Sequence, residues 1–222
     1  TLYQAEYRQD NKKSDHFMDI GILNKSRLIE TNKTQGTHFY VKSNFDTDVN
    51  FFENSKIGIN IQQVSQDNYL KTYKIESPLI NNSTVLNSKI EFEGSNKDLD
   101  LNLYTEVWED LSKEESDRYE YIFPSYNLTK YIESSLDGEL SFTSSGSNKL
   151  YNTNIYEKSM TNDLNFQSFK NIIANGFVTN YEFLLKNSNS DSKNSKTSKN
   201  KRDQNLQSII KYQIQYPLKK KG

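Results

Sequence analysis

Three acidic side chains in one stretch have the residue type and spacing that glycoside hydrolysis requires. Asp98, Asp100 and Glu106 are separated by even numbers of residues. In an extended strand, side chains two positions apart lie on one side at ~6.5–7 Å, which suits a pair of carboxylates acting on a glycosidic bond. The apolar residues that alternate with these acids explain them as the polar side of a strand, and we adopt this interpretation.

Two other groups would suit metal binding or acid–base catalysis. Glu114, Glu115 and Asp117 offer carboxylates for a divalent cation, and Asp15 beside His16 pairs an acid with a base. The sequence has no serine nucleophile elbow that could act with His16. A chain with no cysteine and two histidines also offers few zinc ligands. We therefore predict a solvated acidic loop at 114–117, with no catalytic residue, no metal site and no cofactor, so the chain is not expected to be an enzyme.

Basic residues gather in residues 186–205 and at Lys219–Lys221. The first segment has five Lys and one Arg against two Asp, and it contains no apolar residue. We predict a long polar loop there, within one domain, because an alternating pattern resumes after it. Contact with an anionic sugar is the functional alternative for this segment. The formal net charge is −1, which argues against a nucleic-acid partner.

The composition alone suggests disorder, but the order of the residues predicts strands. Hydrophobic residues make up 33 % of the 222 residues, and 27 Asn with 26 Ser form about a quarter of the chain, as in disordered proteins. Fifteen Tyr and twelve Phe oppose that interpretation. No apolar run approaches the ~20 residues of a transmembrane helix.

Apolar and polar residues alternate along most of the chain. The clearest stretch places Leu99, Leu101, Leu103 and Val107 on one face of a strand, whereas the 3.6-residue period of a helix would scatter them. The same alternation predicts about ten strands. They cover residues 3–7, 18–22, 39–45, 57–61, 86–93, 99–108, 140–142, 164–166, 177–185 and 210–216.

This alternation fits two kinds of all-β protein. A soluble sandwich turns its apolar faces inward around a core, whereas a transmembrane barrel turns them outward against lipid and keeps a polar lumen. Three features favour the barrel: long polar series, Tyr and Phe near strand ends, and connections of very uneven length. The alternatives that remain open are another outer-membrane barrel, such as a porin or a TonB-dependent receptor, and a soluble secreted β-sandwich binding module.

Several short motifs, in their order along residues 36–218, resemble one known family. The stretch Gln66–Tyr73 contains an acid, a Tyr-Leu pair and a second tyrosine, and the stretch Asp117–Tyr126 contains a proline before a strand. The positions that carry the resemblance are Asp67, Tyr69, Leu70, Tyr73, Pro124, Tyr126, Gly138, Leu140, Tyr216 and Pro217. They resemble the C-terminal barrel domain of the LPS-assembly (LptD) family, also called organic solvent tolerance proteins.

The resemblance implies a fold, a function and partners. It implies that residues 1–222 form an open or partial antiparallel transmembrane β-barrel in the outer membrane of a Gram-negative cell, with Leu99, Leu101, Leu103 and Val107 facing lipid. It also implies a translocon that inserts lipopolysaccharide (LPS) into the outer leaflet, with an LptE-type plug lipoprotein and periplasmic LPS bridge proteins as partners.

The chain departs from the family's pattern in two ways. Better-known members carry paired cysteines, and this chain has none. About ten strands are less than half of the family's barrel, and no periplasmic jelly-roll domain is recognised. We therefore expect a piece of a longer protein.

Overall fold

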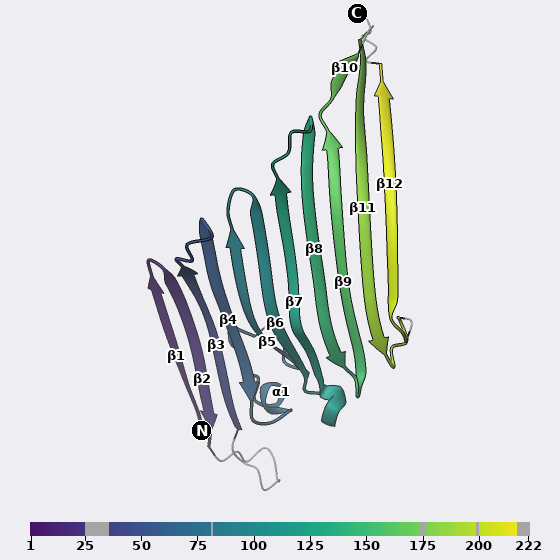
Figure 1. Ribbon diagram of the computed structural model, residues 1–222. Coiled ribbons are helices and arrows are strands. Elements are labelled where there is room, and N and C mark those ends of the chain that lie inside the picture. The colour runs from purple at the N-terminus through teal and green to yellow at the C-terminus, as the bar shows by residue number, and fades with distance from the viewer. Residues whose placement is uncertain (25–35, 81, 174–175, 199, 217–222) are drawn as a thin grey trace, which may run out of the picture.

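The structure, a computed structural model, describes residues 1–24, 36–80, 82–173, 176–198 and 200–216, and strands dominate it (Figure 1). The strands are β1 (Leu2–Asn11), β2 (Ser14–Leu23), β3 (Gly36–Thr47), β4 (Asn54–Val64), β5 (Val85–Ser95), β6 (Leu99–Asp110), β7 (Tyr119–Ile132), β8 (Gly138–Tyr151), β9 (Ile155–Ser168), β10 (Asn171–Ile173), β11 (Phe177–Lys193) and β12 (Asp203–Gln215). The helices are α1 (Tyr69–Tyr73) and the 3-10 turn η1 (Glu115–Arg118). No helix in these ranges has the length and apolarity needed to cross a membrane.

All twelve strands belong to one antiparallel sheet. From β1 to β9 each strand pairs with the next in sequence, and β11 then pairs with β9, β10 and β12. β10 pairs with the same edge of β11 as β9 does. β9 and β10 therefore act together as one interrupted strand. The sequence predicted about ten antiparallel strands and missed β10, which results from this interruption. It also missed β7, which starts at Tyr119, before Pro124.

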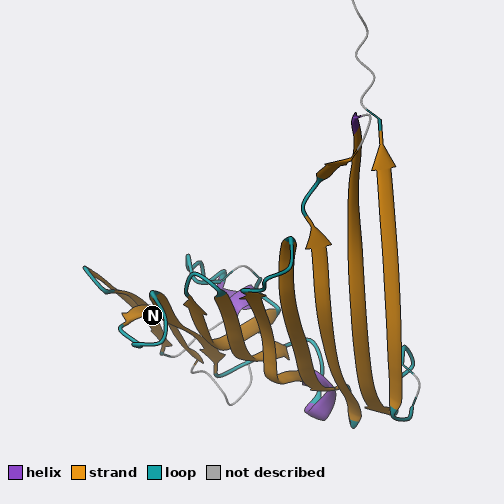
Figure 2. Cartoon of the chain, turned by 45° about the horizontal axis from the view of Figure 1, so that its top comes forward, coloured by secondary structure: helices purple, strands orange, loops and turns teal. Residues whose placement is uncertain are grey.

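The sheet is open and its strands are strongly staggered. β1 and β12 lie at opposite edges, and the sheet curves between them (Figure 2). The upper ends of the strands rise step by step from β1 towards β11 (Figure 1). An all-β antiparallel fold is thus confirmed, and the edges of the described sheet do not meet.

The predicted loop over 186–205 is wrong for most of its length. β11 continues to Lys193 and β12 begins at Asp203, so that only 194–202 connect them. Both neighbours of β11 pair with this part of it: Lys186 is paired with Asp163 of β9 and with Gln207 of β12. The ladder hydrogen bonds need no apolar side chain, and the segment is therefore a strand without a hydrophobic signal.

The one compact core within the described ranges lies where the β4–β5 connection folds against the sheet. Leu70 of α1 joins Leu79, Leu86 and Leu111 there, and all four are buried. Tyr40, Tyr69, Leu70, Leu86, His38 and Asp19 are the largest fully buried side chains of the described residues. A single open sheet buries little else, because no second layer covers its faces within those ranges.

Candidate functional site

One face of the sheet is apolar and exposed. We call it the apolar face. Register pairs place Val41 opposite Ile61, Phe92 opposite Leu103, and Phe166 opposite Phe183 on this face. Its members include Tyr3, Tyr7, Ile20, Ile22, Phe39, Val41, Ile57, Ile59, Ile61, Ile90, Phe92, Leu99, Leu101, Leu103, Val107, Leu128, Phe142, Leu164, Phe166, Phe183, Leu185, Ile210, Tyr212 and Ile214.

Large apolar side chains on this face are open to the surroundings. Ile22 is 52 % exposed, Ile90 53 % and Ile210 77 %. An exposed apolar surface that runs over many strands is much larger than the scattered patches of ordinary soluble proteins, and marks an interaction surface. The prediction that Leu99, Leu101, Leu103 and Val107 share one face is confirmed.

The apolar side chains form a diagonal band. A line of paired residues crosses the sheet at right angles to the strands. It runs through Asn11, Ser14, Phe45, Ile57, Phe92, Leu103, Tyr126, Gly146, Met160, Asn189 and Gln204. The line thus joins the last residue of β1 to the second residue of β12. On β1 the apolar residues centre on Ala5, which lies below the line in Figure 1. On β12 they centre on Tyr212, which lies above it.

The slope of this band matches strand tilt in membrane barrels. The centre of the band shifts by about fourteen residues, or roughly 46 Å at ~3.3 Å per residue, over a width of roughly 48 Å at ~4.8 Å per strand. If the band is set horizontal, the strands are tilted by about 45° from the vertical. This angle is close to the ~35–45° strand tilt of outer-membrane barrels.

The opposite face is mainly polar, and we call it the polar face. Leu23 and Tyr40 on this face belong to the compact core, and Leu184 pairs with Ile209 on it. Hydrogen bonds and ion pairs connect neighbouring strands across it, such as Asn87 Nδ2 to Glu106 Oε1 at 2.8 Å and Lys186 to Asp163 at 3.4 Å. Its strand positions carry acids at 6, 10, 15, 19, 46, 91, 93, 100, 106, 110, 120, 139, 157, 163, 182 and 203, and bases at 8, 42, 56, 89, 149, 186 and 211. Acids outnumber bases by more than two to one, so this surface attracts cations.

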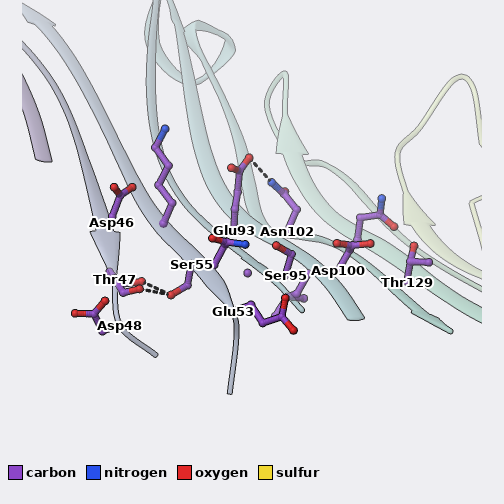
Figure 3. A pocket seen from close by; sticks show the side chains of 15 residues that line it. Asp46, Thr47, Asp48, Glu53, Ser55, Glu93, Ser95, Asp100, Asn102 and Thr129 are labelled. Carbon is purple, nitrogen blue, oxygen red and sulfur yellow. Dashed lines mark hydrogen bonds between the residues drawn. The ribbon is translucent and has the colours of Figure 1, made fainter. Parts of the chain in front are cut away.

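A hollow of about 590 Å³ lies on the polar face at the upper ends of β3 to β7. Asp46, Glu93 and Asp100 come from three strands around it, and Glu93 accepts a hydrogen bond from Asn102 at 3.3 Å (Figure 3). Among the described residues, no three acids, histidines or cysteines lie close enough together to hold a metal ion. The hollow is therefore an acidic, water-accessible recess.

A buried polar cluster attaches α1 to the polar face at the other end of the strands. His38 Nε2 lies 3.2 Å from Asp19 Oδ1, and His38 Nδ1 lies 3.1 Å from the Tyr69 hydroxyl. Gln4 donates to both Asp19 oxygens at 3.1 and 3.2 Å. Burial raises the pKa of Tyr69 to about 12, which keeps its hydroxyl protonated. The Asp19 carboxylate can only accept, so His38 Nε2 donates to it, and His38 Nδ1 shares a hydrogen bond with the Tyr69 hydroxyl.

The acid and histidine that are neighbours in the sequence, Asp15 and His16, do not form a pair. Asp15 accepts a hydrogen bond from Asn44 at 2.9 Å, whereas His16 packs against Phe45 with ring centroids 5.0 Å apart. Adjacent residues of a strand point to opposite faces, so Asp15 and His16 do not meet. The pair that does meet, Asp19 and His38, comes from two strands, and only the register of β2 with β3 shows it.

The other acidic candidates do not converge. Asp100 and Glu106 lie on the polar face of β6, about 20 Å apart along the strand, and Asp98 precedes β6. Asp117 accepts a hydrogen bond from Thr153. Glu114 is exposed, and the side chain of Glu115 lies outside the described part of the chain. Lys219–Lys221 also lie outside it.

Most of the motif positions lie at contacts between different elements of the fold. Tyr69 and Leu70 belong to the buried cluster and the core, Tyr73 packs beside them, and Asp67 pairs with Arg118 of η1 at 2.7 Å. Pro124 lies where the register of β7 with β8 shifts. A Cβ on Gly138 would lie 2.4 Å from the Gln167 carbonyl oxygen, so this position requires glycine.

The remaining motif positions lie on or beside the apolar face. Tyr126 and Leu140 belong to it, and the Tyr216 ring lies 4.9 Å from that of Phe177. Pro217 lies outside the described residues. No protein-family model matches the chain, and no curated protein matches it.

Proposed function

We propose that the chain forms part of the wall of an outer-membrane β-barrel. The observation that carries this proposal is the diagonal apolar band, which has the slope of a tilted membrane barrel while the other face of the same strands is polar. On β6 the band runs from Leu99 to Val107, or roughly 20 Å along the membrane normal at the tilt given above, near the ~25 Å of outer-membrane barrels.

An open sheet needs further strands to close a barrel. Among the described strands, none pairs with the outer edges of β1 and β12, and lipid cannot satisfy the backbone groups of such edges. We propose that additional strands pair with both edges, so that the polar face lines an aqueous passage.

The connections indicate an orientation. In Figure 1 the lower ends are joined by 65–84, 111–118, 152–154 and 194–202, and the upper ends from β1 to β8 by 12–13, 48–53, 96–98 and 133–137. Three of these four lower connections are longer than any of these upper ones. Outer-membrane barrels have short periplasmic turns and long outer loops. We therefore propose that the lower end, with α1, faces the cell exterior.

The resemblance to the LPS-assembly family gives this passage a cargo. We propose that the barrel inserts LPS into the outer leaflet, without forming or breaking a covalent bond, together with an LptE-type plug lipoprotein and periplasmic LPS bridge proteins. A polar face rich in Asn, Ser and Thr is suited to a hydrated sugar. Its acidic excess repels bare phosphate, so we expect the LPS phosphates to cross with bound cations.

Photo-crosslinking from one strand tests the cargo. Asn127 and Leu128 are neighbours on β7 that lie on the polar and apolar faces. In cells that make LPS, a photoreactive residue at position 127 is expected to give an LPS-linked product, detected with an LPS antibody. The same photoreactive residue at position 128 is the control. In the proposed barrel it faces lipid in the half of the membrane nearer the short turns. Equal yields at both positions, or none at 127, would contradict LPS passage along the polar face.

A further inference from the structure

The segment Gln66–Ile80 is attached to the sheet in an unusual way. Backbone hydrogen bonds of residues 68–80 join residues of the segment itself, as in Thr72 to Asn68 and Ile75 to Leu70. Neighbouring strands of the sheet, by contrast, are joined by continuous ladders. The segment can therefore leave the sheet without breaking a ladder.

Side chains make the attachments, and they spread over many strands. Gln4 of β1 donates to the Glu76 carbonyl at 3.4 Å, and Gln62 of β4 donates to the Leu79 carbonyl at 2.6 Å. Asp67 pairs with Arg118 of η1 at 2.7 Å, just before β7. The segment thus spans the polar face from β1 to the start of β7, at the end with the long connections.

The central attachment is the buried chain from Tyr69 through His38 to Asp19. The sheet is shaped around it: a Cβ on Gly36 would lie 2.4 Å from the Tyr69 ring, and a Cβ on Gly21 would lie 2.1 Å from the His38 ring. Tyr40 stacks on His38 with ring centroids 4.8 Å apart. These contacts fix the imidazole in the one orientation that receives the Tyr69 hydroxyl.

We infer that Gln66–Ile80 is a lid inside the passage, latched shut by the Tyr69 hydroxyl on His38, which opens to let a bulky polar solute leave. This inference rests on the proposed function, because the segment is a lid only if the polar face lines a passage. Closed, the segment covers the polar face of β2 to β4. When the segment is open, Gly21, Gly36 and the Asp19–His38 pair are exposed to water.

A cysteine reporter tests the latch in the protein reconstituted into lipid vesicles. The chain has no cysteine, so Leu70→Cys places a single thiol at a position that is 1 % exposed. Its reaction with a membrane-impermeant maleimide then reports opening of the lid. Lys71→Cys, at an exposed position of the same helix, gives the reaction rate of a free thiol.

Tyr69→Phe removes only the latching hydroxyl. Loss of a buried hydrogen bond is expected to raise the open fraction, and with it the labelling rate of the thiol at position 70, by about 5- to 100-fold. Tyr73→Phe is the matched control, because the Tyr73 ring packs in the same cluster while no hydrogen bond to its hydroxyl exists among the described residues.

The single tryptophan gives a second readout without cysteine. Trp108 lines the same hollow as Pro78 and Leu79, so opening of the lid is expected to increase its quenching by acrylamide in Tyr69→Phe and not in Tyr73→Phe. Insertion with unchanged labelling and unchanged quenching in Tyr69→Phe would overturn the lid alone. Failure of the unmodified protein to insert into vesicles together with the strands that complete the barrel would overturn the proposed function, and the lid with it.

Discussion

Leu103→Lys is expected to prevent most of the protein from inserting into a membrane, whereas Asn102→Lys leaves insertion intact. Leu103 lies in the middle of the apolar stretch of β6 and is 41 % exposed, whereas Asn102 lies on the polar face. A lysine on the lipid face near the bilayer centre costs about 2–4 kcal/mol. The ratio of inserted to free protein should fall by about 30- to 800-fold, since each 1.4 kcal/mol is a factor of about ten.

The two substitutions form a matched pair. They introduce the same charge at adjacent positions of one strand, so a general effect of lysine on β-propensity would appear in both. The inserted fraction can be followed by protection from protease in vesicles. Equal insertion of Leu103→Lys and Asn102→Lys would mean that the apolar face does not contact lipid.

Gly21→Ala is expected to destabilise the protein by about 1–3 kcal/mol, the usual result of overpacking a filled site. The added methyl group would lie 2.1 Å from His38 Cε1. His38 cannot move aside, because Asp19 and Tyr69 hold its two nitrogens and Tyr40 stacks on its ring. The midpoint of urea unfolding in detergent should therefore fall clearly.

Gly58→Ala is the control for this prediction. Gly58 also lies on the polar face, but its added Cβ would meet chiefly the Glu91 side chain, whose Cγ lies 3.0 Å away, and a long side chain can shift. We expect a smaller loss of stability than for Gly21→Ala, because the Glu91 side chain can rotate away from the added methyl group whereas the His38 ring cannot. An unfolding midpoint for Gly21→Ala as high as that of Gly58→Ala would show that the buried cluster is loosely packed.

The alternation of residues was sufficient to predict most of the strands, because a half-buried strand needs apolar side chains at every second position. Leu99 to Val107 on β6 and Ile57 to Ile61 on β4 illustrate this. The lower part of β11 was missed for the same reason. Where the strands extend past the apolar band, both faces meet water, and residues such as Asn187 and Asn189 carry no pattern.

The buried cluster was not predictable in the same way. Asp19, His38 and Tyr69 are far apart in the chain, and only the register of β2 with β3 and the folding back of 66–80 bring them together. A signal was present in Gly21 and Gly36, since a glycine on a strand often marks a close approach of another group. The partner of each glycine still had to come from the structure.

The strand order also bears on the soluble sandwich that the sequence left open. A sandwich needs a second sheet packed on the first, and all the described strands belong to one sheet. The slope of the apolar band can be calculated only when the register of every strand pair from β1 to β12 is known. No local pattern in the sequence gives that register.

Quenching of tryptophan by lipids with brominated acyl chains tests most directly whether the apolar face contacts lipid. With Trp108→Phe as background, Ile90→Trp and Glu91→Trp place a single indole on opposite faces of β5. We predict strong quenching at position 90 and little at position 91 in reconstituted vesicles. Quenching that is absent at 90, or equal at both positions, would contradict a membrane wall with a water-filled polar side.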